Sequence, residues 1–134
     1  MIWGCQWDVT CNWIANYGDK KNISDSSTWG NYSNYNTANS YSEGDTGYEA
    51  EAGSKQNTGS SEYWKANNIY DFAGNCLEWT QEAVGTDGRA HRGGGCYNSG
   101  SVSPASFRSG YYPTYDYASN GRFSSHFNSA TLSN

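Results

Sequence analysis

The sequence has few aliphatic side chains and no long apolar run. Only 35% of its residues are hydrophobic, and its mean hydropathy is -0.89. No stretch approaches the roughly 20 apolar residues that cross a bilayer, and Met1-Ile2-Trp3 lacks the basic region that begins a signal peptide. We therefore expect no membrane insertion. The localisation stays open, because virion proteins and fragments of longer chains also lack such signals.

Positive charge is also scarce. The chain carries eight Lys and Arg against thirteen Asp and Glu, which gives a net charge of -5 and an isoelectric point near 4.8. Binding to phosphate backbones relies on clustered cations, and here the cations are scattered. We therefore do not expect nucleic acid as a partner.

The four cysteines include no CxxC pair, so a structural zinc site is not expected. Their even number permits disulfides without requiring them. We predict free and mostly buried thiols, which pack as small hydrophobic side chains. The cysteines are Cys5, Cys11, Cys76 and Cys96.

Aromatic residues compensate for the missing aliphatics. The chain has 12 Tyr, 6 Trp and 4 Phe, and each one removes roughly 150–250 Å² from water when buried. The length of 134 residues suits one hydrophobic core. We therefore predict a single α+β domain over residues 1–134 with an aromatic core, either complete or the C-terminal part of a longer protein.

The hydrophobic spacing predicts few regular elements. A helix is expected at about 7–17, with Asp8 or Thr10 at its start and Gly18 near its end. Residues 18–61 predict turns and loops whose aromatics fix them to the core. Further along, short strands are expected at 77–80, at 106–109 and at 122–127, and another strand is expected to begin within 92–96.

Two segments resemble one protein family. Asn68-Ile69-Tyr70-Asp71-Phe72-Ala73-Gly74-Asn75-Cys76-Leu77-Glu78-Trp79-Thr80 is similar to a signature of the formylglycine-generating-enzyme (sulfatase-modifying factor) superfamily. His91-Arg92-Gly93-Gly94-Gly95, with Phe107-Arg108-Ser109 after it, is similar to its second conserved region. The resemblance covers about residues 67–123. It implies a C-type-lectin-like fold with one or two helices, short antiparallel strands and a high loop content.

That superfamily contains both enzymes and binding proteins. In its copper enzymes two thiols follow the glycine-rich strand, and the matching positions here are Asn98 and Ser103. Its iron-dependent relatives need several His ligands, whereas this chain has only His91 and His126. The resemblance therefore implies no catalytic residues. We therefore expect a binding protein. The alternative function is that of a formylglycine-generating-like oxidase, or the chain is a degenerate, non-catalytic relative of one.

The segment from Tyr97 to Asn120 has the composition of a recognition loop. Tyr, Ser, Asn and Gly make up fifteen of its twenty-four residues, as in antibody paratopes. It looks like the diversified segment of the variable proteins of diversity-generating retroelements, found in phage tails and on bacterial surfaces. We expect ligand contacts from Tyr97, Asn98, Ser99, Ser101, Ser109, Tyr111, Tyr112, Tyr115, Tyr117 and Asn120, and scaffold roles for Pro104, Phe107, Arg108 and Pro113.

The resemblance implies a protein or glycan target on a cell surface, and oligomers formed through an anchor region outside this chain. An alternative origin of the Tyr-rich segment is a fixed loop that covers the core. In the family a structural Ca²⁺ is often held near the first motif. Here its ligands would come from Asp71, Gly74, Cys76 and Glu78. Alternatively, Asp71 caps the turn and Glu78 pairs with Arg92 or Arg108.

Overall fold

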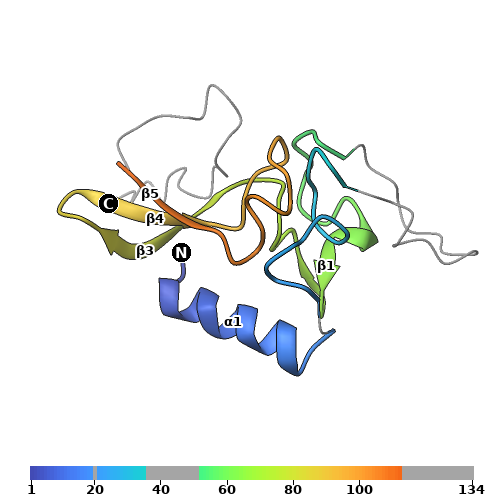
Figure 1. The fold of residues 1–134 in the computed structure, drawn as a ribbon, viewed down its shortest axis with the longest axis horizontal. Helices are drawn as coiled ribbons and strands as arrows, with labels where there is room; N and C mark the ends of the chain where they lie inside the picture. Colours follow the sequence, from blue (N-terminus) through green and yellow to red (C-terminus); the bar gives the residue numbers. More distant parts are fainter. Residues whose placement is uncertain (20, 36–51, 113–134) are drawn as a thin grey trace, which may run out of the picture.

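The structure is a computed structural model that describes residues 1–19, 21–35 and 52–112. One α-helix, α1 (Gly4–Asn16), lies along the lower edge of the molecule in Figure 1. A three-stranded antiparallel sheet of β3 (Glu78–Val84), β4 (Gly88–Arg92) and β5 (Arg108–Tyr111) lies above it. Loops make up much of the remainder. The predicted α+β class with one helix and short antiparallel strands is thus confirmed for this part of the chain.

Helix α1 begins three residues before the predicted start. The side chain of Gln6 accepts a hydrogen bond from the Trp3 backbone N–H at 2.8 Å, which satisfies a donor at the helix start. Asp8 and Thr10 therefore lie inside the helix, and the prediction that one of them begins it was wrong. The C-terminal end of α1 agrees with the predicted end near Gly18, since the N–H of Gly18 donates to the Trp13 carbonyl.

The large sheet has the strand order β3-β4-β5. Trp79 pairs with His91, and His91 pairs with Ser109, so these side chains share one face. Strand β3 extends four residues past the predicted end, and Thr80, which the alternation assigned to a polar face, is fully buried. Its hydroxyl donates to the Ala90 carbonyl at 3.1 Å, which makes this burial tolerable.

The glycine-rich segment ends a strand, so the prediction that a strand begins at 92–96 was wrong. Strand β4 stops at Arg92, and Gly93 and Gly94 have φ of 84° and 70°, outside the β region. The strand predicted at 106–109 begins two residues later, because the Phe107 N–H donates to the Pro104 carbonyl in a turn. The strand predicted at 122–127 lies outside the described residues.

A two-residue hairpin was not predicted. Strand β1 (Lys65–Ala66) follows the 3-10 helix η2 (Glu62–Trp64) and pairs with β2 (Ile69–Tyr70). The turn residues Asn67 and Asn68 have φ of 50° and 64°, as a tight hairpin turn requires. The adjacent asparagines, a residue type that tolerates positive φ, were the feature of the sequence that could have predicted this turn.

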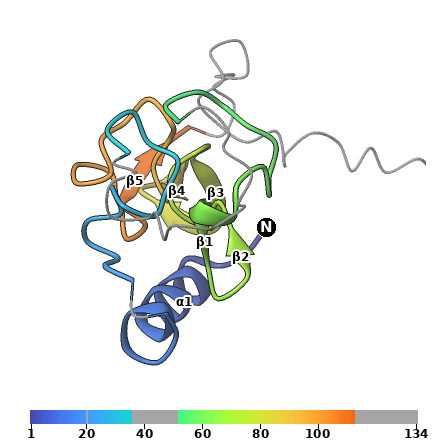
Figure 2. The same ribbon diagram turned by 90° about the vertical axis from the view of Figure 1, so that its right-hand side faces the viewer.

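The core is aromatic, as predicted. Trp7 of α1 stacks on Phe72 with 4.1 Å between ring centroids, and its indole N–H donates to the Ala105 carbonyl at 2.8 Å. Trp29 and Tyr32 are buried and fix the loop that contains them to the core. In Figures 1 and 2 this loop, drawn in cyan, lies next to the loops drawn in orange. No helix in the described part of the chain is long and apolar enough to cross a membrane.

All four cysteines are free, and three are buried, as predicted. Burial raises the pKa of Cys11 to about 11 and also raises the pKa of Cys76 and of Cys96. These thiols therefore stay protonated at neutral pH. A protonated thiol is a poor nucleophile and a poor metal ligand, so packing is the role that their surroundings favour.

Candidate functional site

The two motif segments meet in one hydrogen-bonded junction. The Gly74 N–H donates to the Gly93 carbonyl at 2.7 Å, and the Cys96 N–H donates to the Asn75 carbonyl at 2.9 Å. The buried Tyr32 hydroxyl also donates to the Gly93 carbonyl. The junction holds the glycine-rich segment in place at the point where the predicted recognition loop begins.

The loop after this junction is fixed on both sides. A Cβ on Gly94 would clash with the Ser103 carbonyl, so the close approach of the two loop ends requires glycine there. Across the loop, Gly100 donates to the Asn34 side chain at 2.8 Å and accepts from the Ser26 N–H at 2.9 Å. We conclude that residues 97–103 form a preorganised loop.

Asn98 has the most internal role of the predicted contact residues. Its side-chain oxygen accepts from the Gly95 N–H at 2.9 Å, and its carbonyl accepts from the backbone and the hydroxyl of Ser33. It is half-buried. These bonds make Asn98 a support for the loop.

The tip of the loop faces solvent. Tyr97 is 39% exposed and Ser101 is exposed, while Ser99 is half-buried. The hydroxyls of Ser99 and Ser101 lie 2.8 Å apart in a hydrogen bond. The structure thus brings these two predicted contact residues together beside an exposed tyrosine.

A second group of predicted contact residues, the β5 group, lies on β5 and at the residue that follows it. Ser109 and Tyr111 are half-buried, and Tyr112 is 58% exposed. The rings of Tyr111 and Tyr112 meet edge to face with 6.2 Å between centroids. Because Tyr111 is three residues beyond Arg108, it lies about 10 Å along the strand from the end that adjoins the loop. Tyr115, Tyr117 and Asn120 lie outside the described residues.

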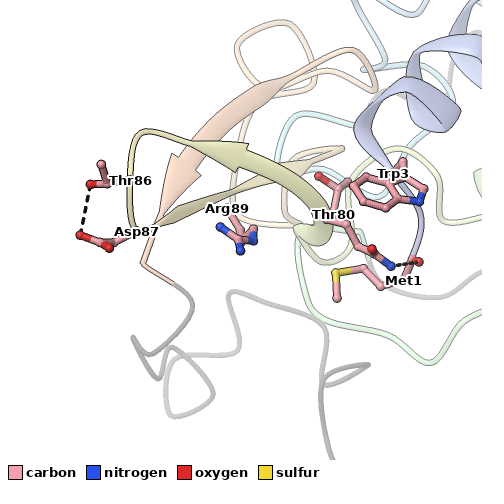
Figure 3. A pocket seen from close by; sticks show the side chains of 7 residues that line it. Met1, Trp3, Thr80, Thr86, Asp87 and Arg89 are labelled. Atoms are coloured by element: carbon pink, nitrogen blue, oxygen red, sulfur yellow. Dashed lines mark hydrogen bonds between the residues drawn. The ribbon is translucent and has the colours of Figure 1, made fainter.

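A pocket of about 680 Å³ lies between the N-terminal segment and the β3–β4 hairpin (Figure 3). Arg89 lines it and pairs directly with Tyr111, so both side chains lie on one face of the sheet. The guanidinium donates to the neighbouring Gly88 carbonyl at 2.9 Å. Trp3, more than half exposed, forms an apolar wall. The lining residues are Met1, Trp3, Thr80, Gln81, Thr86, Asp87 and Arg89.

Sequence reasoning missed this pocket. Its lining comes from the N-terminal segment and from the β3–β4 hairpin, which are about 80 positions apart in the chain. The Gln81 N–H donates to the Ile2 carbonyl at 3.0 Å and holds the two segments together. No local pattern predicts such a pairing, although Asp87 and Arg89 were recognisable as charged residues beside a turn.

The residues predicted to bind Ca²⁺ have mixed surroundings. Asp71 is buried, one of its oxygens accepts from the Gly59 N–H at 3.0 Å, and the other lacks a partner among the described residues. Burial raises the pKa of Asp71, and the Gly59 hydrogen bond lowers it by less. Gly74 and Cys76 lie in the motif junction, and Glu78 lies at the start of β3.

The described residues hold no group of three or more His, Cys, Asp and Glu that could bind a metal ion. The Ca²⁺ site therefore stays a prediction, in which one side-chain oxygen of Asp71 is the best candidate ligand. Arg92 forms an ion pair with Asp8, and Arg108 forms one with Glu82. Glu78 lies opposite Arg92 in the β3–β4 register, and its pairing with an arginine stays the alternative prediction.

His91 is buried in an aromatic environment. Its ring lies 5.7 Å from Trp79 and 6.0 Å from Phe107, measured between centroids. Burial lowers the pKa of His91 to about 4, so the imidazole is neutral at physiological pH. His126 lies outside the described residues.

Comparison with known proteins identified no matching family model, no matching curated protein and no matching solved structure.

Proposed function

We propose that this chain is a target-binding variable protein of the diversity-generating-retroelement type, built on a C-type-lectin-like scaffold. Its ligand would be a protein or glycan on a cell surface, and its context a phage tail or a bacterial surface. The observation that carries the proposal is the loop 97–103, which displays Tyr97 and Ser101 from a backbone fixed by hydrogen bonds.

Preorganisation supports recognition on energetic grounds. Ordering a flexible loop on binding costs about 0.5–1.5 kcal/mol for each immobilised side chain, and a fixed loop avoids much of this cost. Tyrosine supplies a broad contact with few rotatable bonds, while serine hydroxyls adapt their hydrogen bonds. The loop combines both features.

The β5 group supplies a second contact region. Tyr111 pairs with Arg89, which lines the pocket, and its ring meets that of Tyr112 edge to face. Aromatic and arginine side chains are enriched at the energetic centres of interfaces. We place the strongest contacts at this end of the sheet.

A display library tests the proposal. Positions Tyr97, Ser99, Ser101, Ser109, Tyr111 and Tyr112 are varied together, and the library is selected against unrelated bacterial surface proteins. We expect most members to fold and some to bind one target specifically. A control library varies buried polar positions Ser26, Asn31 and Thr80 and should lose the fold. If the surface library unfolds as often as the control, the Tyr-rich segment is part of the scaffold and the proposal fails.

The second candidate is an oxidase related to formylglycine-generating enzymes. The motif resemblance favours it, but Cys96 is buried with a raised pKa and the positions matching the copper thiols are Asn98 and Ser103. Metal analysis of protein purified in the presence of Cu(I) or iron distinguishes the two. Stoichiometric retention of either metal would favour the enzyme.

A further inference from the structure

The side chain of Arg89 has no acidic partner in the part of the chain that the structure describes. The ion pairs there involve Lys65, Arg92 and Arg108. Arg89 is half-buried, and its guanidinium donates from Nη1 to the Gly88 carbonyl. That bond leaves other N–H groups of the guanidinium fork for a ligand. Because a cation that is partly removed from water gains from an opposite charge, Arg89 can receive an anionic group from outside the chain.

Arg89 lines the pocket between the N-terminal segment and the β3–β4 hairpin. The pocket volume of about 680 Å³ lies within the usual range for small-molecule sites. In the view of Figure 3, the Arg89 side chain lies between the Thr86–Asp87 hydrogen bond at the hairpin turn and Met1. Five of the seven lining residues are polar, so the pocket suits a ligand with several polar groups better than an acyl chain.

The polar lining offers acceptors as well as donors. One carboxylate oxygen of the exposed Asp87 accepts from the Thr86 hydroxyl at 3.2 Å. The side-chain amide of Gln81 donates to the Met1 carbonyl at 3.3 Å, which uses the donor end of the amide. Carboxylate and amide oxygens accept hydrogen bonds from hydroxyl groups. A ligand that carries hydroxyls beside its anionic group therefore complements this lining.

Trp3 gives the pocket an apolar side. It is 54% exposed, and its N–H donates to the Gln6 side chain, which fixes the backbone at this position. The face of an indole ring carries negative charge density, which attracts the weakly positive C–H groups of a saturated ring. A pyranose sugar has such a C–H face and carries hydroxyls around its edge.

We propose that this pocket binds the terminal sugar of a glycan when that sugar carries a carboxylate, as a uronic acid does. The carboxylate binds the Arg89 guanidinium, and the C–H face of the ring lies on Trp3. The sugar hydroxyls donate to Asp87 and Gln81. A phosphorylated ligand fits less well, because phosphate carries nearly two negative charges and the lining side chains hold one cation against one anion.

The pocket is separate from the predicted recognition segment. None of its lining residues falls within residues 96–128, which the proposed function treats as diversified. The pocket would therefore bind the same acidic sugar whatever target the Tyr-rich segment selects. A constant weak site on the same molecule as a variable one raises the overall avidity for a surface that presents both ligands.

Nuclear magnetic resonance titration of the full ¹⁵N-labelled chain at neutral pH tests the proposal. The probe is methyl β-D-glucuronide, whose capped anomeric carbon imitates the end of a glycan. We expect it to shift the amide signals of Gln81 and Arg89 with a dissociation constant on the order of 1 mM. Methyl β-D-glucoside, which has a hydroxymethyl group in place of the carboxylate, should bind at least about tenfold more weakly. Sodium acetate, which has the charge without the ring, should also bind at least about tenfold more weakly.

Arg89→Gln is the decisive variant. It should lower the affinity for the glucuronide to that for the glucoside and leave the affinity for the glucoside unchanged. Lys65→Gln is the matched control, because it removes one positive charge from β1, outside the pocket, and should bind both compounds as the unaltered chain does. Circular dichroism checks that both variants fold. If Arg89→Gln does not fold, the comparison of the two glycosides on the unaltered chain still decides.

Equal binding of the two glycosides, or no shift up to about 20 mM glucuronide, would overturn the proposal. Glucuronide binding that survives Arg89→Gln would do the same. Shifts confined to residues 97–103 would also overturn it, because they would place the sugar on the recognition loop, and they would leave the proposed function intact. Failure of the display library, by contrast, would leave sugar binding at Gln81 and Arg89 unaffected.

Discussion

Gly74 shows how much of the fold depends on single backbone positions. Its φ is 77°, its N–H donates to Gly93, and its Cα lies so close to Asn31 that a Cβ would clash with the Asn31 backbone. A non-glycine residue therefore meets both backbone strain and overlap. The glycine in the first motif is explained by this close approach of two chain segments.

Replacing Gly74 by Ala should destabilise the fold far more than the same substitution at another glycine with a similar φ. Gly85 has φ of 66° and open space where a Cβ would lie, so Gly85→Ala isolates the backbone strain. We expect about 1 kcal/mol for Gly85→Ala and at least about 2 kcal/mol more for Gly74→Ala, measured as free energies of unfolding in urea. Equal losses would show that the Asn31 contact is relaxed in solution.

His91 predicts a pH dependence of stability. The pKa of His91 is about 4 in the folded chain and near 6.5 when unfolded, so between these values the unfolded chain binds the extra proton. The contribution of the neutral His91 imidazole to the free energy of unfolding is complete above about pH 6.5 and is lost as the pH falls toward 4. The loss reaches up to about 3 kcal/mol.

The measurement compares the unaltered chain with His91→Gln across pH 4 to 7 by urea unfolding. Burial of Asp71 raises its pKa and acts in the opposite direction, but it is common to both chains and cancels in the difference. We expect the difference in unfolding free energy to shrink as the pH falls. A difference that is independent of pH would mean that the imidazole is solvated.

At the scale of elements, one ion pair joins α1 to the sheet. The Arg92 side chain is almost fully buried, and Asp8, its partner, is largely exposed. Removal of a partner from a buried charge costs about 3–5 kcal/mol in well-enclosed pairs, and the exposure of Asp8 places this pair toward the lower end.

Asp8→Ala should therefore destabilise the chain by about 2–3 kcal/mol, and Arg92→Met in the same chain should recover part of the loss. Glu62→Ala is the control, because the Glu62–Lys65 pair is exposed and its loss should leave the unfolding midpoint unchanged. An Asp8→Ala chain as stable as the Glu62→Ala chain would contradict this account of the α1 contact.

The elements differed in how well the sequence predicted them. Helix α1 was foreseen from apolar residues spaced four apart, such as Val9, Trp13 and Tyr17, although these side chains turn out to be exposed. Its start depends on the Gln6 side chain reaching back to Trp3. The glycine-rich segment was misread as a strand because glycine marks both bulges and strand ends. Only the positive φ of Gly93 and Gly94 resolves that choice.

At the scale of the whole molecule, long-range contacts set the limits of prediction. Composition alone predicted the aromatic core and the exposed Tyr97 of the loop, since these follow from side-chain chemistry. The supporting role of Asn98 and the pocket beside Arg89 depend on segments that are far apart in the chain. Such contacts have no local signature, so they emerge only from the three-dimensional structure.

The central claim is that the Tyr-rich segment is a diversified recognition surface on a fixed scaffold. Comparison of the gene with its neighbouring DNA tests it most directly. The account predicts a near-identical repeat whose mismatches to the codons of residues 96–128 fall at adenines, with codons such as that of Tyr97 changed and that of Gly94 unchanged. A neighbourhood without such a repeat, or with mismatches spread evenly over all bases, would contradict it.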